Sequence, residues 1–167
     1  MIRILTIFML ASLALPVAAG DLEKTLGRSS LEVRAVQLSA AMLVDEMNRE
    51  RARHGLAPLR LDSRLSLAAE DRINDMFDKR YFDHVAPDGT PPFVWAGRRG
   101  YGYRAIAENL AVGYRTSSNL IEGWMGSAGH RKNILGKRFE EVGIAISAGS
   151  PTKQFGGPTV VALYGSR

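Results

Sequence analysis

Hydrophobic residues in the first part of the chain recur at intervals of three and four, which is the period of an amphipathic helix. The first such stripe comprises Ala40, Leu43, Val44 and Met47. Gly55 and Pro58 follow it and predict the helix end, because glycine favours a left-handed cap and proline cannot continue a helix. A second helix is predicted to begin at Asp62 or Ser63 and to end near residues 79–81. Its buried stripe is expected to comprise Leu65, Ala68, Ala69, Ile73, Met76 and Phe77.

The rest of the chain passes from turn residues to helical and then to strand patterns. The sequence first predicts turns over 82–92, a short helix over 91–99 and an irregular or short-strand stretch over 100–113. It then predicts a helix that starts at Ser117 or Ser118 and breaks at Gly126, followed by one more helical turn over 130–135. Residues 142–146 alternate between apolar and small side chains, and residues 159–164 are rich in β-forming residues, so a long hairpin is predicted. Helices followed by strands predict an α+β fold with helices covering an antiparallel sheet.

The first residues match a secretory signal peptide. Arg3 supplies a positive start, residues 4–15 form an apolar run, and small residues follow at the cleavage position. The run of about a dozen residues is shorter than the roughly 20 that span a bilayer, which favours cleavage over a retained anchor. We therefore expect a secreted or periplasmic protein with no transmembrane anchor after signal cleavage. The predicted parts are a signal peptide over 1–19, a lead-in segment over 20–37 and a domain over 38–167.

Composition and charge narrow the class of protein. The chain has no cysteine, which excludes a disulfide framework and thiolate metal sites. Roughly 147 mature residues are enough to bury a core without disulfides. The formal charge of +5 becomes 5 − 1 = +4 without Arg3, and the basic residues are scattered among acidic ones. A nucleic-acid binder would show a dense basic stripe with aromatic residues, so no nucleic-acid partner is expected.

Glu108 stands out because it lies in an otherwise apolar stretch, residues 105–111. An unpaired buried polar group costs about 1–3 kcal/mol, so Glu108 is expected to contact a histidine, backbone N–H groups or a metal. The chain has three histidines. His54 falls in the last turn of the first helix, where a cation suits the helix dipole. His84 lies in a stiff turn and, taken alone, is typical of a hydrogen-bonding surface residue, whereas His130 lies where a helix start would favour the neutral ring that a metal or general base needs.

Two imidazoles and a carboxylate suit Zn²⁺ with water in the fourth position, so His84, His130 and Glu108 are the candidate ligands of a divalent metal, Zn²⁺ or Mg²⁺. Their separations of 24 and 22 residues match no local metal motif. The candidate catalytic residues are Glu108, His130 and Ser127. Ser127 is the weakest of them, because it lies three positions from His130 and its Gly-Ser-Ala-Gly sequence lacks the G-x-S-x-G spacing.

Five short motifs stand in a distinctive order between residues 38 and 165. They are Leu43–Arg51, Phe82-Asp83-His84 with Pro87-Asp88-Gly89, Ala107–Ala111, Gly123–Leu135 and Glu141–Ile144. In this order they resemble the CAP superfamily, or SCP domain, which includes cysteine-rich secretory proteins, insect venom antigens, plant pathogenesis-related proteins and bacterial relatives. The motif that contains His130 resembles the bacterial version of the family signature.

The resemblance implies an α–β–α sandwich with a small, mostly antiparallel central sheet and a cleft that holds two histidines and two glutamates. Matched residue by residue, His84 and His130 are the two histidines and Glu108 is the first glutamate. The second glutamate lies three residues after the helix tryptophan in animal and plant members, and Ser127 occupies that place here. The chain also lacks the disulfides of those branches, and residues 161–165 lack a polar pair often present on the final strand.

Three functions compete on this basis. The preferred hypothesis is a monomeric, non-catalytic domain whose cleft holds a divalent metal and binds a lipid, sterol, glycan or peptide. The alternative is a metal-assisted hydrolase in which His84 and His130 hold the ion and Glu108 is the general base. The third is a purely structural cleft. A fold alone does not decide between them.

Overall fold

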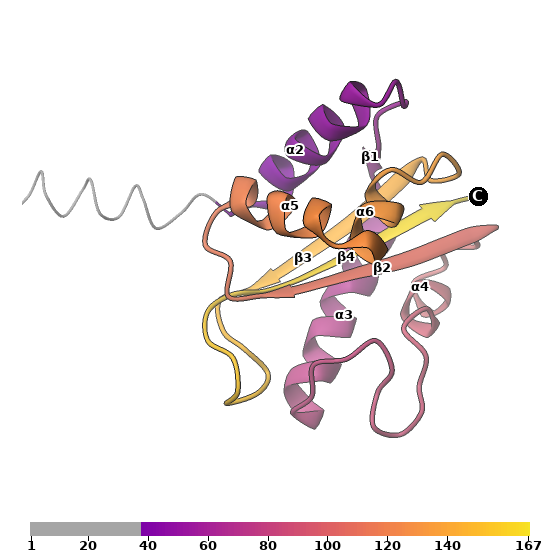
Figure 1. Ribbon diagram of the computed structural model, residues 1–167. Coiled ribbons are helices and arrows are strands. Elements are labelled where there is room, and N and C mark those ends of the chain that lie inside the picture. The colour runs from indigo at the N-terminus through magenta and orange to yellow at the C-terminus, as the bar shows by residue number, and fades with distance from the viewer. Residues whose placement is uncertain (1–37) are drawn as a thin grey trace, which may run out of the picture. The chain divides into compact units, whose positions relative to one another are not determined.

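The computed structural model describes residues 38–167, which Figure 1 shows in colour. The predicted signal peptide and lead-in segment, residues 1–37, lie outside the described residues. Within the described part, no helix is both long and apolar enough to cross a membrane. Helices cover both faces of one four-stranded sheet, as the α+β prediction requires.

The sheet is mixed, with the strand order β1–β3–β4–β2. Its strands are β1 (Arg60–Leu61), β2 (Ala105–Val112), β3 (Glu141–Ser147) and β4 (Thr159–Ser166). β3 and β4 form the predicted antiparallel hairpin, and β2 pairs antiparallel with the other side of β4. The short β1 runs parallel to β3. The prediction of a small, mostly antiparallel sheet is confirmed.

β2 is longer and more regular than the sequence predicted. Residues 100–113 were expected to be irregular or to form a short strand, but eight consecutive residues pair with β4, from Ala105 with Ser166 to Val112 with Thr159. The strand is buried continuously from residue 107 to 111, so its sequence lacks the alternation of a half-exposed strand. β1 was not predicted either, because two residues are too few to form a pattern.

Alternate residues of β4 divide the core into two layers. Val160, Ala162 and Tyr164 belong to one hydrophobic cluster, whereas Val161 and Leu163 belong to the other. On the first face lie α2 (Ala40–Arg53), α5 (Ser117–Gly126) and α6 (Ala128–Ile134), and on the second lie α3 (Ser63–Lys79) and α4 (Val94–Arg98). The predicted α–β–α sandwich is therefore confirmed.

The first two helices begin where the sequence predicted. The Ser39 side chain caps α2, and the Asp62 carboxylate caps α3 by accepting from the main-chain N–H of Leu65 at 3.1 Å. The stripe predicted for α3 needs one correction, since Phe77 is only partly buried while Arg72 is fully buried. β3 lies directly against this helix because residue 143 is glycine, where a Cβ atom would overlap the main chain of Leu65.

α5 begins where the sequence predicted, whereas α6 begins slightly earlier. Thr116 caps α5, so the helix starts at Ser117. α6 starts at Ala128, two residues before the turn that the sequence indicated. As a result His130 lies in the first turn of α6 rather than at its first residue.

Candidate functional site

Glu108 lies on β2 with its side chain 1% exposed, and each of its carboxylate oxygens accepts a hydrogen bond. His84 Nδ1 lies 2.7 Å from Oε1, and Arg72 Nε donates to Oε2 at 3.1 Å. The expectation that Glu108 has a partner is met by a histidine, one of the three kinds foreseen. The second partner, an arginine, was not foreseen.

Arg72 lies on α3 and is as deeply buried as Glu108. Its two terminal nitrogens donate to the Tyr81 hydroxyl and to the main-chain carbonyl of Asp83. The Tyr81 hydroxyl in turn donates to Asp75 Oδ2 at 2.5 Å. Burial, assisted by the hydrogen bond to Asp75, raises the pKa of Tyr81 to about 12. Each of the three guanidinium nitrogens donates a hydrogen bond in the interior, so the arginine has little freedom to move.

The loop that carries His84 is fastened to α3 at two points. Arg72 holds the Asp83 carbonyl, and Lys79 bridges Asp75 on α3 at 2.7 Å and Asp88 in the loop at 2.6 Å. Within the loop, the Asp83 carboxylate accepts from the main-chain N–H of His84 at 2.6 Å. These contacts explain how an imidazole that is 51% exposed keeps a defined position.

The hydrogen bond to Glu108 determines which nitrogen of His84 is available. A carboxylate only accepts, so Nδ1 of the ring carries the proton, and in the neutral ring Nε2 has the free lone pair. The same hydrogen bond raises the pKa of His84, although partial burial of the ring opposes it. The neutral ring is therefore set up to bind an ion or a proton through Nε2.

His130 is half-buried and behaves in the opposite way. Burial lowers its pKa, and a positive charge on His84 lowers it further, so the two imidazoles are within electrostatic reach of each other. Its ring centroid lies 6.1 Å from that of the buried Trp124. Within residues 38–167 its ring nitrogens form no hydrogen bond, and a neutral imidazole is favoured there.

Side chains of α5 and α6 close the free edge of β2 beside these residues. Asn133 Nδ2 donates to the carbonyl of Glu108 at 3.2 Å, and Trp124 Nε1 donates to the carbonyl of Leu110 at 3.1 Å. Asn109 Nδ2 donates to the carbonyl of His130 at 3.2 Å. An open strand edge would otherwise present unpaired groups. The edge of β2 is thus the element that brings Glu108 toward the helix that carries His130.

The predicted ligand set was His84, His130 and Glu108. In residues 38–167 no three histidine or acidic side chains are placed so that all could hold one metal ion. Both Glu108 oxygens already accept hydrogen bonds, from Arg72 and from His84. The three-ligand set stays a prediction, and the side chains with nitrogens free for a metal are the two histidines.

Two other candidate residues lie apart from these contacts. Ser127 joins α5 to α6, caps α6 with no side-chain hydrogen bond, and forms none with His130, so the nucleophile–base contact of a serine mechanism is not made here. His54 sits at the C-terminal cap of α2, where Nδ1 lies 2.9 Å from the carbonyl of Glu50. The position of His54 agrees with the expected helix-end role.

Sequence reasoning missed Arg72, Tyr81 and Asp75. One signal was present, because Arg72 lies four residues after Ala68 and four before Met76, on the buried stripe of α3. An arginine on such a stripe needs a buried acceptor. Nothing in the spacing indicates that this acceptor is Glu108, 36 residues further along the chain.

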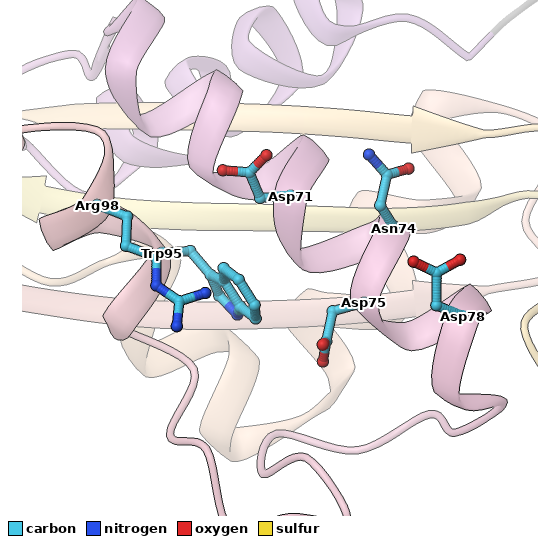
Figure 2. A pocket seen from close by; sticks show the side chains of 6 residues that line it. All are labelled: Asp71, Asn74, Asp75, Asp78, Trp95 and Arg98. Carbon is cyan, nitrogen blue, oxygen red and sulfur yellow. The ribbon is translucent and has the colours of Figure 1, made fainter.

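A groove lies where α4 packs beside α3, next to the far end of these contacts. Figure 2 shows its lining residues, which are Asp71, Asn74, Asp75 and Asp78 of α3 with Trp95 and Arg98 of α4. Its volume is about 320 Å³, and the Arg98 guanidinium lies 4.5 Å from the centre of the Trp95 ring. Asp75 belongs both to this groove and to the contacts behind Glu108.

Comparison with known proteins places the chain in a family. The chain is 41% identical over 115 residues to the uncharacterized protein YkwD of Bacillus subtilis (strain 168), a match that covers 68% of this chain and 45% of that protein. The uncharacterized membrane protein YlbC of the same organism is 28% identical over 137 residues, covering 81% and 40%. The chain thus spans less than half the length of the curated relatives that it matches.

Solved structures show the same fold. An extracellular SCP-domain protein from Bacillus anthracis str. Ames matches with a TM-score of 0.65 and 25% identity, covering 76% of this chain and 40% of that one. An outer surface protein of Borrelia burgdorferi also gives a TM-score of 0.65, at 21% identity, covering 76% and 91%. The model of the cysteine-rich secretory protein family, CAP, matches residues 44–164. The chain belongs to the cysteine-rich secretory protein, or CAP, family.

Proposed function

We propose that this CAP domain is an exported binding module in which His84 and His130 hold a divalent metal ion of the Zn²⁺ type. The observation that carries the proposal is the hydrogen bond between His84 Nδ1 and Glu108 Oε1, at 2.7 Å. Histidines that bind metals commonly donate their other ring N–H to a carboxylate, which fixes the tautomer and raises the basicity of the ligand nitrogen. Glu108 would then orient the His84 ring through this hydrogen bond and would not itself bind the ion.

The residues present suit Zn²⁺ better than Mg²⁺. Imidazole nitrogen is a good ligand for zinc, whereas Mg²⁺ prefers oxygen ligands and retains its water. His130 favours the neutral ring that a metal requires, since burial lowers its pKa. His84 is also available in its neutral form, through Nε2. The proposed ion therefore has two protein ligands, fewer than the three of a typical catalytic zinc site.

An ion held by His84 and His130 would supply a Lewis acid to which water or an oxygen atom of a ligand could bind. We propose that a glycan, lipid, sterol or peptide with such an oxygen is what the domain binds. Glu108 is poorly suited to act as a general base, because both of its oxygens accept hydrogen bonds. This favours binding over the hydrolase alternative, in which Glu108 would have to take a proton from water.

Export of the protein is part of the same proposal. Residues 1–19 have the pattern of a cleaved signal peptide. A solved relative is an extracellular SCP-domain protein, and another is an outer surface protein. Cell fractionation with N-terminal sequencing of the exported protein tests it. We expect a mature chain that begins after Ala19 or Gly20, and retention of the full chain in the cytoplasm would contradict the proposal.

Calorimetric titration of the metal-free protein with Zn²⁺ tests the metal site. We expect one binding event in the wild type and its loss in His84→Ala and in His130→Ala. His54→Ala is the control, because the chain has three histidines and this one contacts the Glu50 carbonyl and Arg131 rather than Glu108. Binding that survives both site variants, or that is lost in the control, would show that the metal lies elsewhere.

The hydrolase alternative is favoured by one feature, the free Nε2 of His84 near a neutral His130. Its test is turnover of a casein or ester substrate by the Zn²⁺-loaded protein. We expect no turnover above that of the Glu108→Ala variant. Turnover that requires Glu108 would replace the binding proposal with the hydrolase.

A further inference from the structure

The contacts behind Glu108 form one unbroken series of polar groups. Asp75 accepts from Tyr81, Tyr81 accepts from Arg72, Arg72 donates to Glu108, and Glu108 accepts from His84. The buried members cannot exchange these partners for water, because Tyr81, Arg72 and Glu108 are each in the interior. A change at one end therefore alters the position of the next group along the series.

We propose that Tyr81 is a positioning residue, which orients the Arg72 guanidinium and thereby fixes Glu108 and the tautomer of His84. The effect of Tyr81 on metal binding by His84 rests on the proposed function. Tyr81 lies nine residues from Arg72 in the chain and touches neither histidine ring. Its influence on His84 would pass through Arg72, which donates both to Glu108 and to the Asp83 carbonyl beside His84.

The Tyr81 hydroxyl both donates and accepts a hydrogen bond. Its single proton goes to Asp75 Oδ2, at 2.5 Å, so only its lone pairs face Arg72. The ring also lies under the guanidinium, with 5.2 Å between the ring centre and Cζ of Arg72. The hydroxyl and the ring together fix the plane of the guanidinium, and that plane determines where Nε meets Glu108.

Asp75 sets the direction of that hydroxyl and is in turn held by Lys79 at 2.7 Å. The carboxylate belongs to the α3 wall of the groove in Figure 2, opposite Trp95 and Arg98. The residue at the end of the series farthest from His84 therefore lines the groove between α3 and α4. This arrangement offers a second variant, Asp75→Asn, which leaves Tyr81 in place and weakens its orientation together with the ion pairs of Asp75 to Lys79 and Arg72.

The test uses the full mature protein without metal and the variant Tyr81→Phe. Long-range ¹H–¹⁵N spectra of the His84 ring report which nitrogen carries the proton. In the wild type we expect the Nδ1–H form, and in Tyr81→Phe a mixture with the Nε2–H form. If Tyr81→Phe does not fold, Asp75→Asn takes its place with the same expected change.

Tyr101→Phe is the matched control for a merely structural role. The Tyr101 hydroxyl is also buried and also donates to a carboxylate, Glu141 Oε2 at 2.6 Å. None of its polar contacts leads to His84. We expect this control to lose stability as Tyr81→Phe does while its His84 spectrum stays that of the wild type.

Zn²⁺ titration supplies the second readout. Mutation of a group that supports a metal ligand typically weakens metal binding 10–100-fold, and for Tyr81→Phe we expect a loss on the order of tenfold, with none in Tyr101→Phe. Wild-type protein that shows the Nδ1–H form but binds no Zn²⁺ would overturn the proposed function and leave the role of Tyr81 standing. An unchanged His84 spectrum in both Tyr81→Phe and Asp75→Asn, or an equal change in Tyr101→Phe, would overturn the role of Tyr81.

Discussion

Two arginines, one on each face of the sheet, are equally buried and yet belong to different kinds of surroundings. Arg51 on α2 donates to four main-chain carbonyls, of Ala57, Ile134, Gly136 and Phe139, at 2.7–3.1 Å. Arg72 on α3 instead meets a carboxylate, a phenol hydroxyl and one carbonyl. Both side chains have about 1% of their surface exposed. The chemistry of the acceptors, and not the depth of burial, separates the two.

The difference shows that a buried arginine can either fix the path of the main chain or position the side chains of a functional site. The acceptors of Arg51 are neutral main-chain groups, so the arginine fixes the path of the chain between α6 and β3 and its influence ends there. Its pKa is lowered because burial removes water and no carboxylate within residues 38–167 pairs with it. Two acceptors of Arg72, Glu108 and the Tyr81 hydroxyl, are side chains that have a further hydrogen-bond partner. Through Glu108, the position of Arg72 therefore affects the orientation of the half-exposed His84.

The largest effect is expected from Arg51→Met, which removes the donor to the carbonyls of Ala57, Ile134 and Phe139, while the Gly136 carbonyl still accepts from the Phe139 N–H. Each unpaired buried group costs about 1–3 kcal/mol, and part of that loss is recovered by relaxation, so we expect the free energy of unfolding to fall by about 4 kcal/mol. Urea denaturation measures it. Zn²⁺ affinity of the folded fraction should stay at the wild-type value, and a loss of affinity would show that the two arginines are coupled.

Arg72→Met should lower the free energy of unfolding by about 3 kcal/mol, because it leaves the Glu108 carboxylate buried without its cation. The double variant Arg72→Met/Glu108→Leu removes both charges and should recover stability to within about 1 kcal/mol of the wild type. It should not recover Zn²⁺ binding, since His84 then lacks its carboxylate. Arg51 permits no such rescue, because its acceptors are main-chain atoms. Failure of the double variant to recover would mean that Arg72 acts chiefly through the Asp83 carbonyl.

The comparison also shows where the sequence was informative and where it was not. The helical stripes and the hairpin followed from periodicity, because each depends on local spacing, whereas the α–β–α layering was implied by the resemblance to the CAP superfamily. Glu108 was predicted to need a partner because a carboxylate in an apolar stretch must be compensated. Its pairing with Arg72 and His84 depends on how β2 lies against α3, and β2 itself was underestimated because it is buried continuously. Long-range pairing of this kind leaves no trace in spacing.

The smallest effect is expected from His84→Gln in the metal-free protein, and it should depend on pH. The pKa of His84 is raised in the folded state by the hydrogen bond to Glu108, so protonation of His84 favours folding. The contribution is fully present below the ordinary histidine pKa of about 6.5 and is lost as the pH rises through the raised pKa. Because the side chain is 51% exposed, solvent screening keeps the difference between wild type and variant below about 1 kcal/mol.

Thermal or urea unfolding of wild type and His84→Gln across pH 5 to 9 measures this difference, with His54→Gln as the control at the end of α2. His130 acts with the opposite sign, since its pKa is lowered and its protonation opposes folding as the pH falls below the ordinary range. The variant retains His130, so that term largely cancels in the difference, and what remains reports the bond to Glu108. A difference that grows with rising pH would mean that Glu108 does not stabilise the protonated ring. In that case the carboxylate would be held by Arg72 alone, and the influence of Arg72 would not extend through Glu108 to His84.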